Sequence, residues 1–204
     1  MHIMFLLAIA GHLLCGVCDC LMTYVPGGKK FDFKQMSDNT AMKETFEKMP
    51  LRNVTLAMVL GCVALFMCAG GYFSLYQWMK EYSSTYSIIM LIGMAMFLVF
   101  GSAHHILCGV AEWIYIRMGM TEEARGAVIK LFKDTSLTMI LCYIGLAMFA
   151  VTFFIAVVTG ATSLPAWACV FNTIPPFLVL TSFRIGGSGN WGGAFMFAGL
   201  MFLI

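Results

Sequence analysis

One pattern of ionisable residues occurs twice in this chain of 204 residues. The segment His12–Asp19 reads HLLCGVCD and the segment His105–Glu112 reads HILCGVAE, with five of eight positions identical. Positions i, i+3 and i+7 lie on one face of an α-helix. Each segment therefore predicts a stripe of histidine, cysteine and carboxylate, residue types that transfer protons and bind transition metals. We call these the first stripe (His12, Cys15, Asp19) and the second stripe (His105, Cys108, Glu112).

The two stripes predict one shared site if their helices run side by side. Parallel helices place like residues level, so we expect His12 and His105 to face each other. Asp19 and Glu112 are expected about 10 Å further along, because seven residues separate them from the histidines. These four residues are the candidate catalytic residues, acting as general acids and bases. Two close acids do not both ionise easily, so we expect one to be protonated, or bridged by Arg184, Lys130 or a cation.

A bound divalent metal is one interpretation of the stripes. One ion cannot contact a whole stripe, because its two ends are about 10 Å apart. The candidate metal ligands are therefore a single layer, His12, Cys15, His105 and Cys108, and the two acids with another group form the alternative layer. Two further interpretations stay open. The stripes either hold two helices together by hydrogen bonds between histidine and carboxylate, or they line a functional pocket in the membrane.

Four further polar residues are candidate ligand-binding residues: Arg184, Asn172, Asn190 and His104. Asn172 precedes Pro175-Pro176, which breaks a helix and frees backbone groups that neighbours or a cavity must satisfy. Arg184 and Asn190 lie at the two ends of a glycine-rich segment that could hold an anion. A simple kink and a tight turn are the structural alternatives for these two segments. His104 points about 100° away from the residue that follows it, and so widens the pocket or faces another helix.

These residues lie in a chain whose composition is typical of a membrane protein. Apolar residues make up 61% and charged residues 11%, and the mean hydropathy is +0.89. A soluble protein of this size needs more polar side chains to cover its surface. The net charge of +2 does not indicate a nucleic-acid partner. We therefore expect an all-α fold, a polytopic transmembrane helix bundle that forms a single domain over residues 1–204.

A spanning helix needs about 20 predominantly apolar residues. About six stretches qualify, the last of them long enough for only about two thirds of a bilayer: residues 2–24, 54–78, 88–115, 137–159, 164–183 and 191–204. Every lysine and arginine except Lys80 lies in the first, third or fifth loop. Positive residues mark cytoplasmic loops. We therefore expect these loops, including residues 25–53, on the cytoplasmic side of a multi-pass protein of the cell membrane.

Two loop segments predict further helical structure. Residues 37–49 carry cap residues and apolar side chains at helical spacing, which predicts a short amphipathic helix, with a solvated linker as the alternative. Thr121, followed by Glu122 and Glu123, predicts a helix start with acids in its first turn.

Three segments carry a resemblance to known proteins: Gly11–Asp19, Pro26-Gly27-Gly28 and the polar stretch Ser182–Asn190. In these segments the sequence resembles a broad family of small bacterial integral membrane proteins that have six spans and no assigned function. A Gly-Asp pair precedes the Pro-Gly turn in that family, whereas Cys18 precedes Asp19 here. The resemblance implies a bundle of six helices and no particular chemistry.

Three functions are compatible with these patterns. The first is an integral membrane protein whose polar pocket, lined by both stripes, binds or modifies a lipid or another amphiphilic small molecule from the cytoplasmic leaflet. The second is a proton- or ion-coupled transporter, which at this size would need a homo-oligomer to form a permeation path. The third is a structural subunit of a membrane complex, which predicts packed stripes and no cavity.

Overall fold

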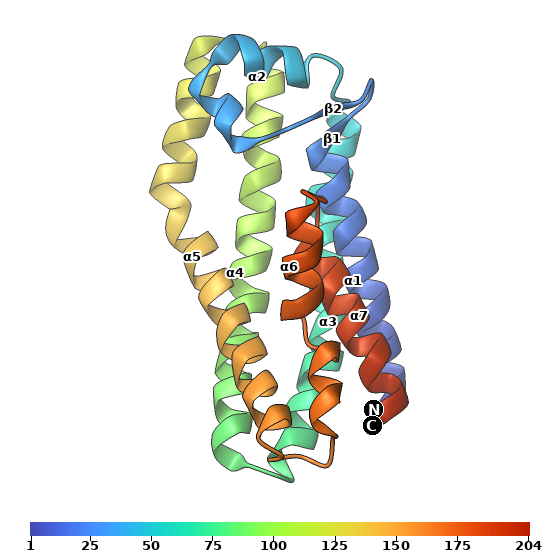
Figure 1. Cartoon of the computed structure of the whole chain (residues 1–204). Helices are drawn as coiled ribbons and strands as arrows, with labels where there is room; N and C mark the ends of the chain where they lie inside the picture. The colour runs from blue at the N-terminus through green and yellow to red at the C-terminus, as the bar shows by residue number, and fades with distance from the viewer.

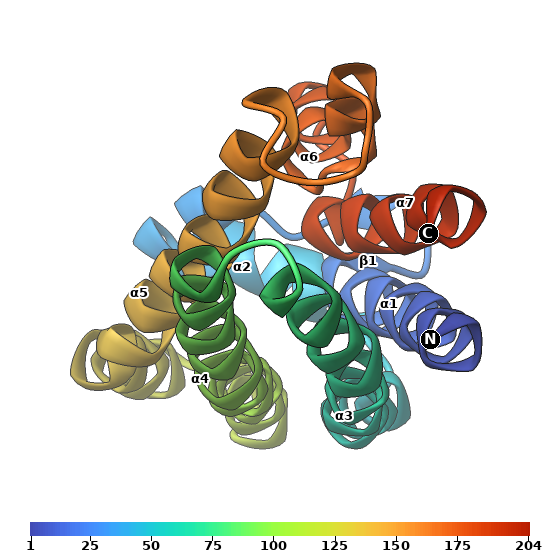
Figure 2. The same ribbon diagram turned by 90° about the horizontal axis from the view of Figure 1, so that it is seen from below.

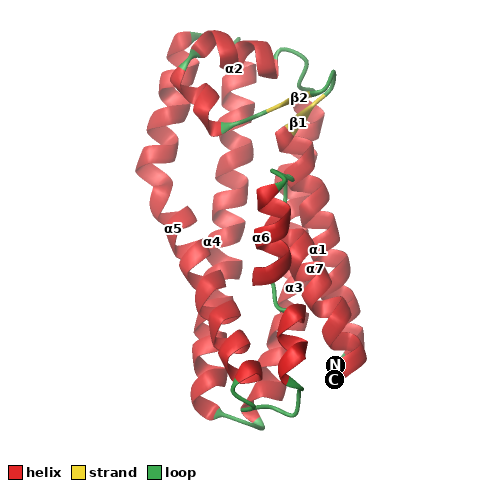
Figure 3. Cartoon of the chain, in the orientation of Figure 1, coloured by secondary structure: helices red, strands yellow, loops and turns green.

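The computed structural model of the chain describes residues 1–204 as a bundle of helices with one two-stranded β-sheet (Figures 1 and 3). Four helices are long and apolar enough to cross a membrane: α1 (His2–Thr23), α3 (Leu51–Lys80), α4 (Ser84–Arg117) and α5 (Glu122–Val158). Both chain termini lie at one end of the bundle, which we call the terminal end (Figure 1). Residues 24–50 cover the opposite end; we call them the cap and that end the capped end.

The all-α prediction is confirmed, and four of the six predicted spans are single helices of spanning length. The fourth begins earlier than expected, at Glu122 rather than near residue 137. Thr121 caps it by accepting a hydrogen bond from the N–H of Ala124 at 3.2 Å, which confirms the predicted helix start. The helix has 37 residues, so it is about 55 Å long, against about 30 Å for a hydrocarbon core. Much of the expected third loop is therefore helical.

The two predicted spans nearest the C-terminus form a shorter hairpin. Residues 164–183 are divided into two short helical segments, and a third returns toward the terminal end: η2 (a 3₁₀-helix, Ala166–Phe171), α6 (Ile174–Ser182) and α7 (Ser188–Leu203). Figure 1 shows this hairpin beside α1, with its tip directed toward the cap. None of the three segments has the length of the four long helices.

The break between η2 and α6 falls at Asn172. The Asn172 side chain accepts a hydrogen bond from the N–H of Ile174 at 3.0 Å and donates one to the carbonyl of Ala150 at 2.9 Å. Pro175 and Pro176 follow in the first turn of α6, where the missing N–H groups cost no helix hydrogen bond. The structure thus replaces one continuous fifth span by two short segments joined at a fixed polar residue.

The helices are arranged around a common interior in the order α5, α4, α3, α1, α7 and α6, which Figure 2 shows from the terminal end. α3 packs on both α1 and α4, so the two helices that carry the stripes are separated by it. η2 packs against α5 near the terminal end. Toward the capped end, α5 leans away from α6 (Figure 1). The ring of helices around this interior is therefore closed by packing between α5 and η2 at the terminal end only.

The lean of α5 follows from a run of hydroxyl residues in its middle. Thr135, Ser136 and Thr138 each donate a side-chain hydrogen bond to a carbonyl of the preceding turn, at 2.7, 3.0 and 2.8 Å. Such bonds compete with the helix ladder and bend helices. The bend directs the charged first turns of α5 toward the cap.

The cap has four elements: β1 (Tyr24–Val25), β2 (Lys29–Lys30), η1 (Phe33–Ser37) and α2 (Asn39–Phe46). The amphipathic helix predicted over residues 37–49 is confirmed as α2, with Asp38 accepting a hydrogen bond from the N–H of Thr40 at 2.9 Å. Met42 and Phe46 on its apolar face are buried at 2% and 0% exposure. They pack against α4 and α5 rather than facing solvent.

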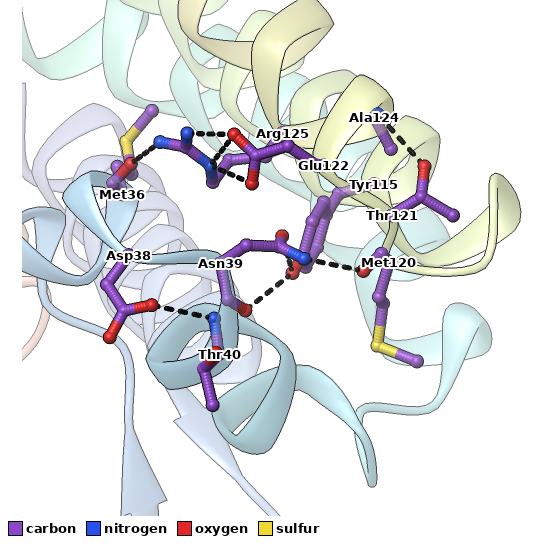
Figure 4. A network of polar contacts seen from close by, with 10 residues as sticks. All are labelled: Met36, Asp38, Asn39, Thr40, Tyr115, Met120, Thr121, Glu122, Ala124 and Arg125. Carbon is purple, nitrogen blue, oxygen red and sulfur yellow. Dashed lines mark hydrogen bonds and ion pairs between the residues drawn. The ribbon is translucent and has the colours of Figure 1, made fainter.

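Polar contacts hold the cap on the turn between α4 and α5 (Figure 4). Tyr115 donates to Oδ1 of Asn39 at 2.8 Å, and Nδ2 of Asn39 donates to the carbonyl of Met120 at 3.2 Å. Arg125 pairs with Glu122 and donates to the carbonyl of Met36 at 2.6 Å. These contacts therefore fix the cap to the helices of the bundle.

Gly145 of α5 is packed directly on the backbone of α4. A Cβ added there would lie 2.6 Å from the N of Phe97 and 2.7 Å from the carbonyl O of Gly93. Backbone atoms cannot move aside as a side-chain end can, so Gly145→Ala should destabilise the fold by about 1–3 kcal/mol. The measurement is the midpoint of thermal unfolding in detergent. Gly126→Ala on the exposed part of the same helix, where a Cβ meets nothing within 4 Å, should instead stabilise by up to about 1 kcal/mol. Equal shifts for the two variants would contradict this packing.

Candidate functional site

The interior of the bundle contains an aromatic cluster and, next to it, a cavity. In the aromatic cluster (Tyr72, Phe97, Phe149, Phe197), the ring centroid of Tyr72 lies 5.6, 4.8 and 5.1 Å from those of the three phenylalanines. A cavity of about 580 Å³ extends from Phe97 of this cluster to Phe46 of the cap. This volume is typical of small-molecule sites. Residues of both stripes line it: Cys15, Asp19, His105, Cys108 and Glu112.

Asp19 is the polar centre of the cavity wall. Its Oδ1 lies 3.5 Å from Nδ1 of His105, and its Oδ2 accepts a hydrogen bond from Nδ2 of Asn190 at 2.8 Å. The Asp19 side chain is 26% exposed, whereas that of His105 is 8% exposed. The two stripes therefore meet, as the sequence predicts, but the carboxylate of the first stripe contacts the histidine of the second.

The position and the tautomer of His105 are set by α3. Nε2 of His105 lies 2.9 Å from the carbonyl oxygen of Ala57. A backbone carbonyl can only accept, so Nε2 carries a proton and the neutral ring presents the lone pair of Nδ1 to Asp19. Gly61 leaves the space for the ring, because a Cβ at this position would clash with the imidazole of His105.

His12 lies outside the cavity wall and is 1% exposed. Its Nδ1 donates to Oδ1 of Asn190 at 3.1 Å, and its Nε2 accepts from the hydroxyl of Tyr72 at 3.1 Å. Asn190 therefore links His12 to Asp19. The prediction that His12 and His105 face each other is wrong, and His12 has no direct access to a molecule in the cavity.

The depth of each residue follows from where its helix begins at the terminal end. α1 begins at His2 and α4 at Ser84. At 1.5 Å per residue, His12 and Asp19 lie about 15 and 26 Å along α1, and His105 lies about 32 Å along α4. His105 is thus nearer the level of Asp19 than of His12. The stripes meet with an offset of about one heptad, because α4 has more residues than α1 between the terminal end and its stripe.

Cys15, Asp19 and His105 form a group that could hold a metal ion, since one ligand atom of each lies within 4.8 Å of the others. Cys15 and His105 were among the four ligands predicted from the sequence. Cys108 lies elsewhere, with its Sγ 3.5 Å from Nε2 of His104 on the same helix. The predicted layer is therefore corrected. Asp19 belongs to the group, whereas His12 and Cys108 do not.

Glu112 lies in the cavity wall closer to the cap. Its side chain is buried, with 8% exposure, and its Oε2 has no hydrogen-bond partner. Arg184 forms no ion pair with Glu112 or Asp19, and Lys130 pairs with Asp134 instead. Of the alternatives expected for the two acids, neither basic bridge therefore forms. A buried carboxylate oxygen without a partner costs about 1–3 kcal/mol or more. It is an acceptor that a donor group of a bound molecule would satisfy.

Two basic side chains line the cavity at the capped end, Lys30 of the cap and Arg184 at the tip of the hairpin. Nζ of Lys30 donates to the carbonyl of Arg184 and lies 5.4 Å from the ring centroid of Tyr24. The hydroxyl of Tyr24 accepts from the N–H of Gly186 at 3.0 Å. These contacts fix the tip of the hairpin on the cap, so both positive charges border the same space.

The predicted ligand-binding residues divide into two groups. Arg184, Asn190 and His104 line the cavity. Asn172 does not, because it is fully buried and both ends of its amide are used at the break between η2 and α6. Its predicted role in binding is replaced by a structural one.

Sequence reasoning missed the contribution of the cap to the site. Lys30 and four apolar side chains of the cap line the cavity: Phe31, Phe33, Met42 and Phe46. The helical spacing of Met42 and Phe46 predicts an apolar face, but only the fold shows that this face covers the end of the cavity. Tyr72, which fixes His12, carried no signal beyond its place in an apolar helix.

The fold and site define an α-helical membrane protein with a cavity between its helices that polar and apolar side chains line together. The chain belongs to a family of unknown function, DUF6796, whose model matches residues 1–203. This match confirms the predicted resemblance to a family without assigned function. No solved structure and no protein with a curated description matches the chain.

Asn190 is the side chain that forms hydrogen bonds with both His12 and Asp19, and its removal should be costly. Asn190→Ala leaves Nδ1 of His12 and Oδ2 of Asp19 without these partners. We expect a loss of about 1–3 kcal/mol in the free energy of unfolding, measured by denaturation in mixed micelles. Asn53→Ala in α3, a partly buried asparagine outside this network, is the matched control and should change stability by less than about 0.5 kcal/mol. An equally small effect at Asn190 would rule out the bridge.

Proposed function

We propose that this protein is a multi-pass membrane protein that binds an amphiphilic small molecule in the cavity between its helices. The observation that carries the proposal is the mixed lining of that one cavity. Apolar side chains such as Leu65, Phe97 and Leu146 share it with the charged or ionisable groups of Asp19 and His105. A molecule with a polar head and an apolar tail matches both parts of this lining.

The polar part of the lining indicates what the head group should contain. Lys30 and Arg184 provide positive charge at the capped end, which favours an anionic group such as phosphate or carboxylate. Glu112 supplies an acceptor without a partner, which favours a hydroxyl or ammonium donor. In the absence of a bound metal, Asp19 and His105 are the pair positioned to move a proton if the bound molecule is modified.

The apolar part of the lining offers a route from the bilayer. Tyr143 of α5 lines the cavity and is 55% exposed on the side of the bundle. Phe177 of α6 lines the same cavity. A second cavity of about 360 Å³ shares Phe33, His104 and Phe132 with the first. An acyl chain could therefore enter between α5 and α6 and extend beneath η1.

The membrane placement belongs to the same proposal. With the orientation predicted from the lysines and arginines, the capped end faces the cytoplasm. The hairpin η2–α6–α7 then takes the place of the fifth and sixth spans, with helices that are shorter than the four long ones. The resemblance of the three sequence segments supports a bacterial cell membrane as the location.

A proton-coupled transporter is the second candidate, and one observation favours it. A chain of polar contacts runs from Tyr72 through His12, Asn190 and Asp19 to His105. The chain ends at Tyr72 inside the aromatic cluster, so it lacks a continuation toward the terminal end. A structural subunit is the least supported candidate, because it predicts packed stripes where the cavity lies.

Filling the cavity should prevent binding without changing any polar group. Leu146 lines the cavity, and Ile144 on the same helix is 46% exposed on the outside of the bundle. We expect wild-type protein purified in mild detergent to retain about one amphiphile per chain, measured by mass spectrometry of extracted lipids. Leu146→Trp should lower that amount about tenfold or more, whereas Ile144→Trp should not. Equal lipid content in both variants, or no stoichiometric amphiphile in the wild type, would count against the proposal.

A further inference from the structure

The atoms that face each other at Asp19 and His105 require a positive charge between them. Nε2 of His105 donates to Ala57, so the neutral ring offers only a lone pair at Nδ1. That lone pair lies 3.5 Å from Oδ1 of the Asp19 carboxylate. Two acceptors at this separation repel each other unless a cation lies between them. The cation is either a proton or a metal ion.

The third member of the group distinguishes these two cations. Cys15 lies one helical turn before Asp19, and its Sγ is within 4.8 Å of the other two ligand atoms. A proton shared between Asp19 and His105 does not require a thiol nearby. Nitrogen, oxygen and sulfur donors that converge on one point are instead a ligand set typical of Zn²⁺, whereas Mg²⁺ and Ca²⁺ take oxygen ligands.

We infer that Cys15, Asp19 and His105 bind one Zn²⁺ ion whose fourth coordination position faces the cavity. The inference goes beyond the proposed function and does not depend on it. A tetrahedral zinc site with bonds of about 2.0–2.3 Å has ligand atoms about 3.3–3.8 Å apart. The 3.5 Å between Asp19 and His105 already has this length. The Sγ of Cys15 lies within 4.8 Å of both other ligand atoms, so a small movement of this side chain toward them completes the set in our inference.

The groups that form hydrogen bonds with the proposed ligands are those that usually support a metal site. Histidines that bind a metal usually donate their other N–H to a carbonyl or a carboxylate, as His105 does to Ala57 at 2.9 Å. The second carboxylate oxygen of Asp19 is held by Asn190 at 2.8 Å. Both ligands are therefore oriented from behind, and their free atoms point to the same place.

The charge balance also favours a divalent ion. When Zn²⁺ binds, Cys15 releases its thiol proton, and the thiolate and the Asp19 carboxylate then offset both positive charges. A neutral centre is far less costly in the membrane interior than separated ions. All three ligands line the cavity that also contains Glu112, whose Oε2 has no partner. The open position therefore faces the same space as the unused acceptor.

Cobalt substitution tests the inference on the purified protein, because its readout is the bound metal and it requires no added amphiphile. After chelator treatment, titration with Co²⁺ should saturate at one ion per chain, with a thiolate-to-cobalt charge-transfer band and the absorption of tetrahedral cobalt. Zn²⁺ should displace the cobalt and abolish both. Cys15→Ser should remove the charge-transfer band, whereas Cys18→Ser, a neighbouring buried cysteine outside the group, should keep it. His105→Gln should weaken Co²⁺ binding about a hundredfold, whereas His12→Gln should not.

Two results would overturn the inference. Failure of the wild type to bind Co²⁺ or Zn²⁺ stoichiometrically would assign the space between Asp19 and His105 to a proton, and this result does not require any variant to fold. Binding that survives both Cys15→Ser and His105→Gln would identify an adventitious ion only. Because the readout is bound metal and not bound lipid, a negative result leaves the lipid measurements on Leu146→Trp unaffected, so the two proposals fail separately.

Discussion

The contact between Asp19 and His105 is the interaction on which the rest of the site depends. It joins two helices that do not pack on each other, since α3 lies between α1 and α4. The contact exists because α3 accommodates the His105 ring at Gly61 and holds it at Ala57. An ionisable pair inside an apolar bundle is costly unless it is paired or bound to an ion. A site of this kind is therefore typical of binding or catalysis rather than of helix packing alone.

The offset between the stripes explains what lies at both ends of this contact. If like residues were level, histidine would meet histidine and carboxylate would meet carboxylate. With the second stripe shifted toward the cap, His12 is left without its counterpart and is held by Asn190 and Tyr72. Glu112 is left at the other end without a partner for Oε2. The cavity lies around this unmatched end, between the cap, the bend of α5 and the tip of the hairpin.

Much of the fold could be predicted from the sequence because it follows from local patterns. Apolar length identifies the four long helices, Thr121 marks the start of α5, and the spacing of Met42 and Phe46 identifies α2. The partners of the site residues are set by depth, which depends on where each helix begins. The three-residue connection Glu81–Ser83 fixes α3 and α4 as a hairpin, so pairing His105 with the region of Gly61 was available from the sequence. The contacts of Asn190 and Lys30 were not, because they join segments far apart in the chain.

A double-mutant cycle tests the central contact most directly. Asp19→Asn, His105→Gln and the double variant are compared by their free energies of unfolding in detergent, beside the same cycle for His12→Gln and His105→Gln. The offset register predicts a coupling energy of about 0.5–3 kcal/mol between Asp19 and His105 and additivity within about 0.5 kcal/mol between the two histidines. Additive effects at Asp19 and His105, with coupling between His12 and His105 instead, would contradict the offset register and the site built on it.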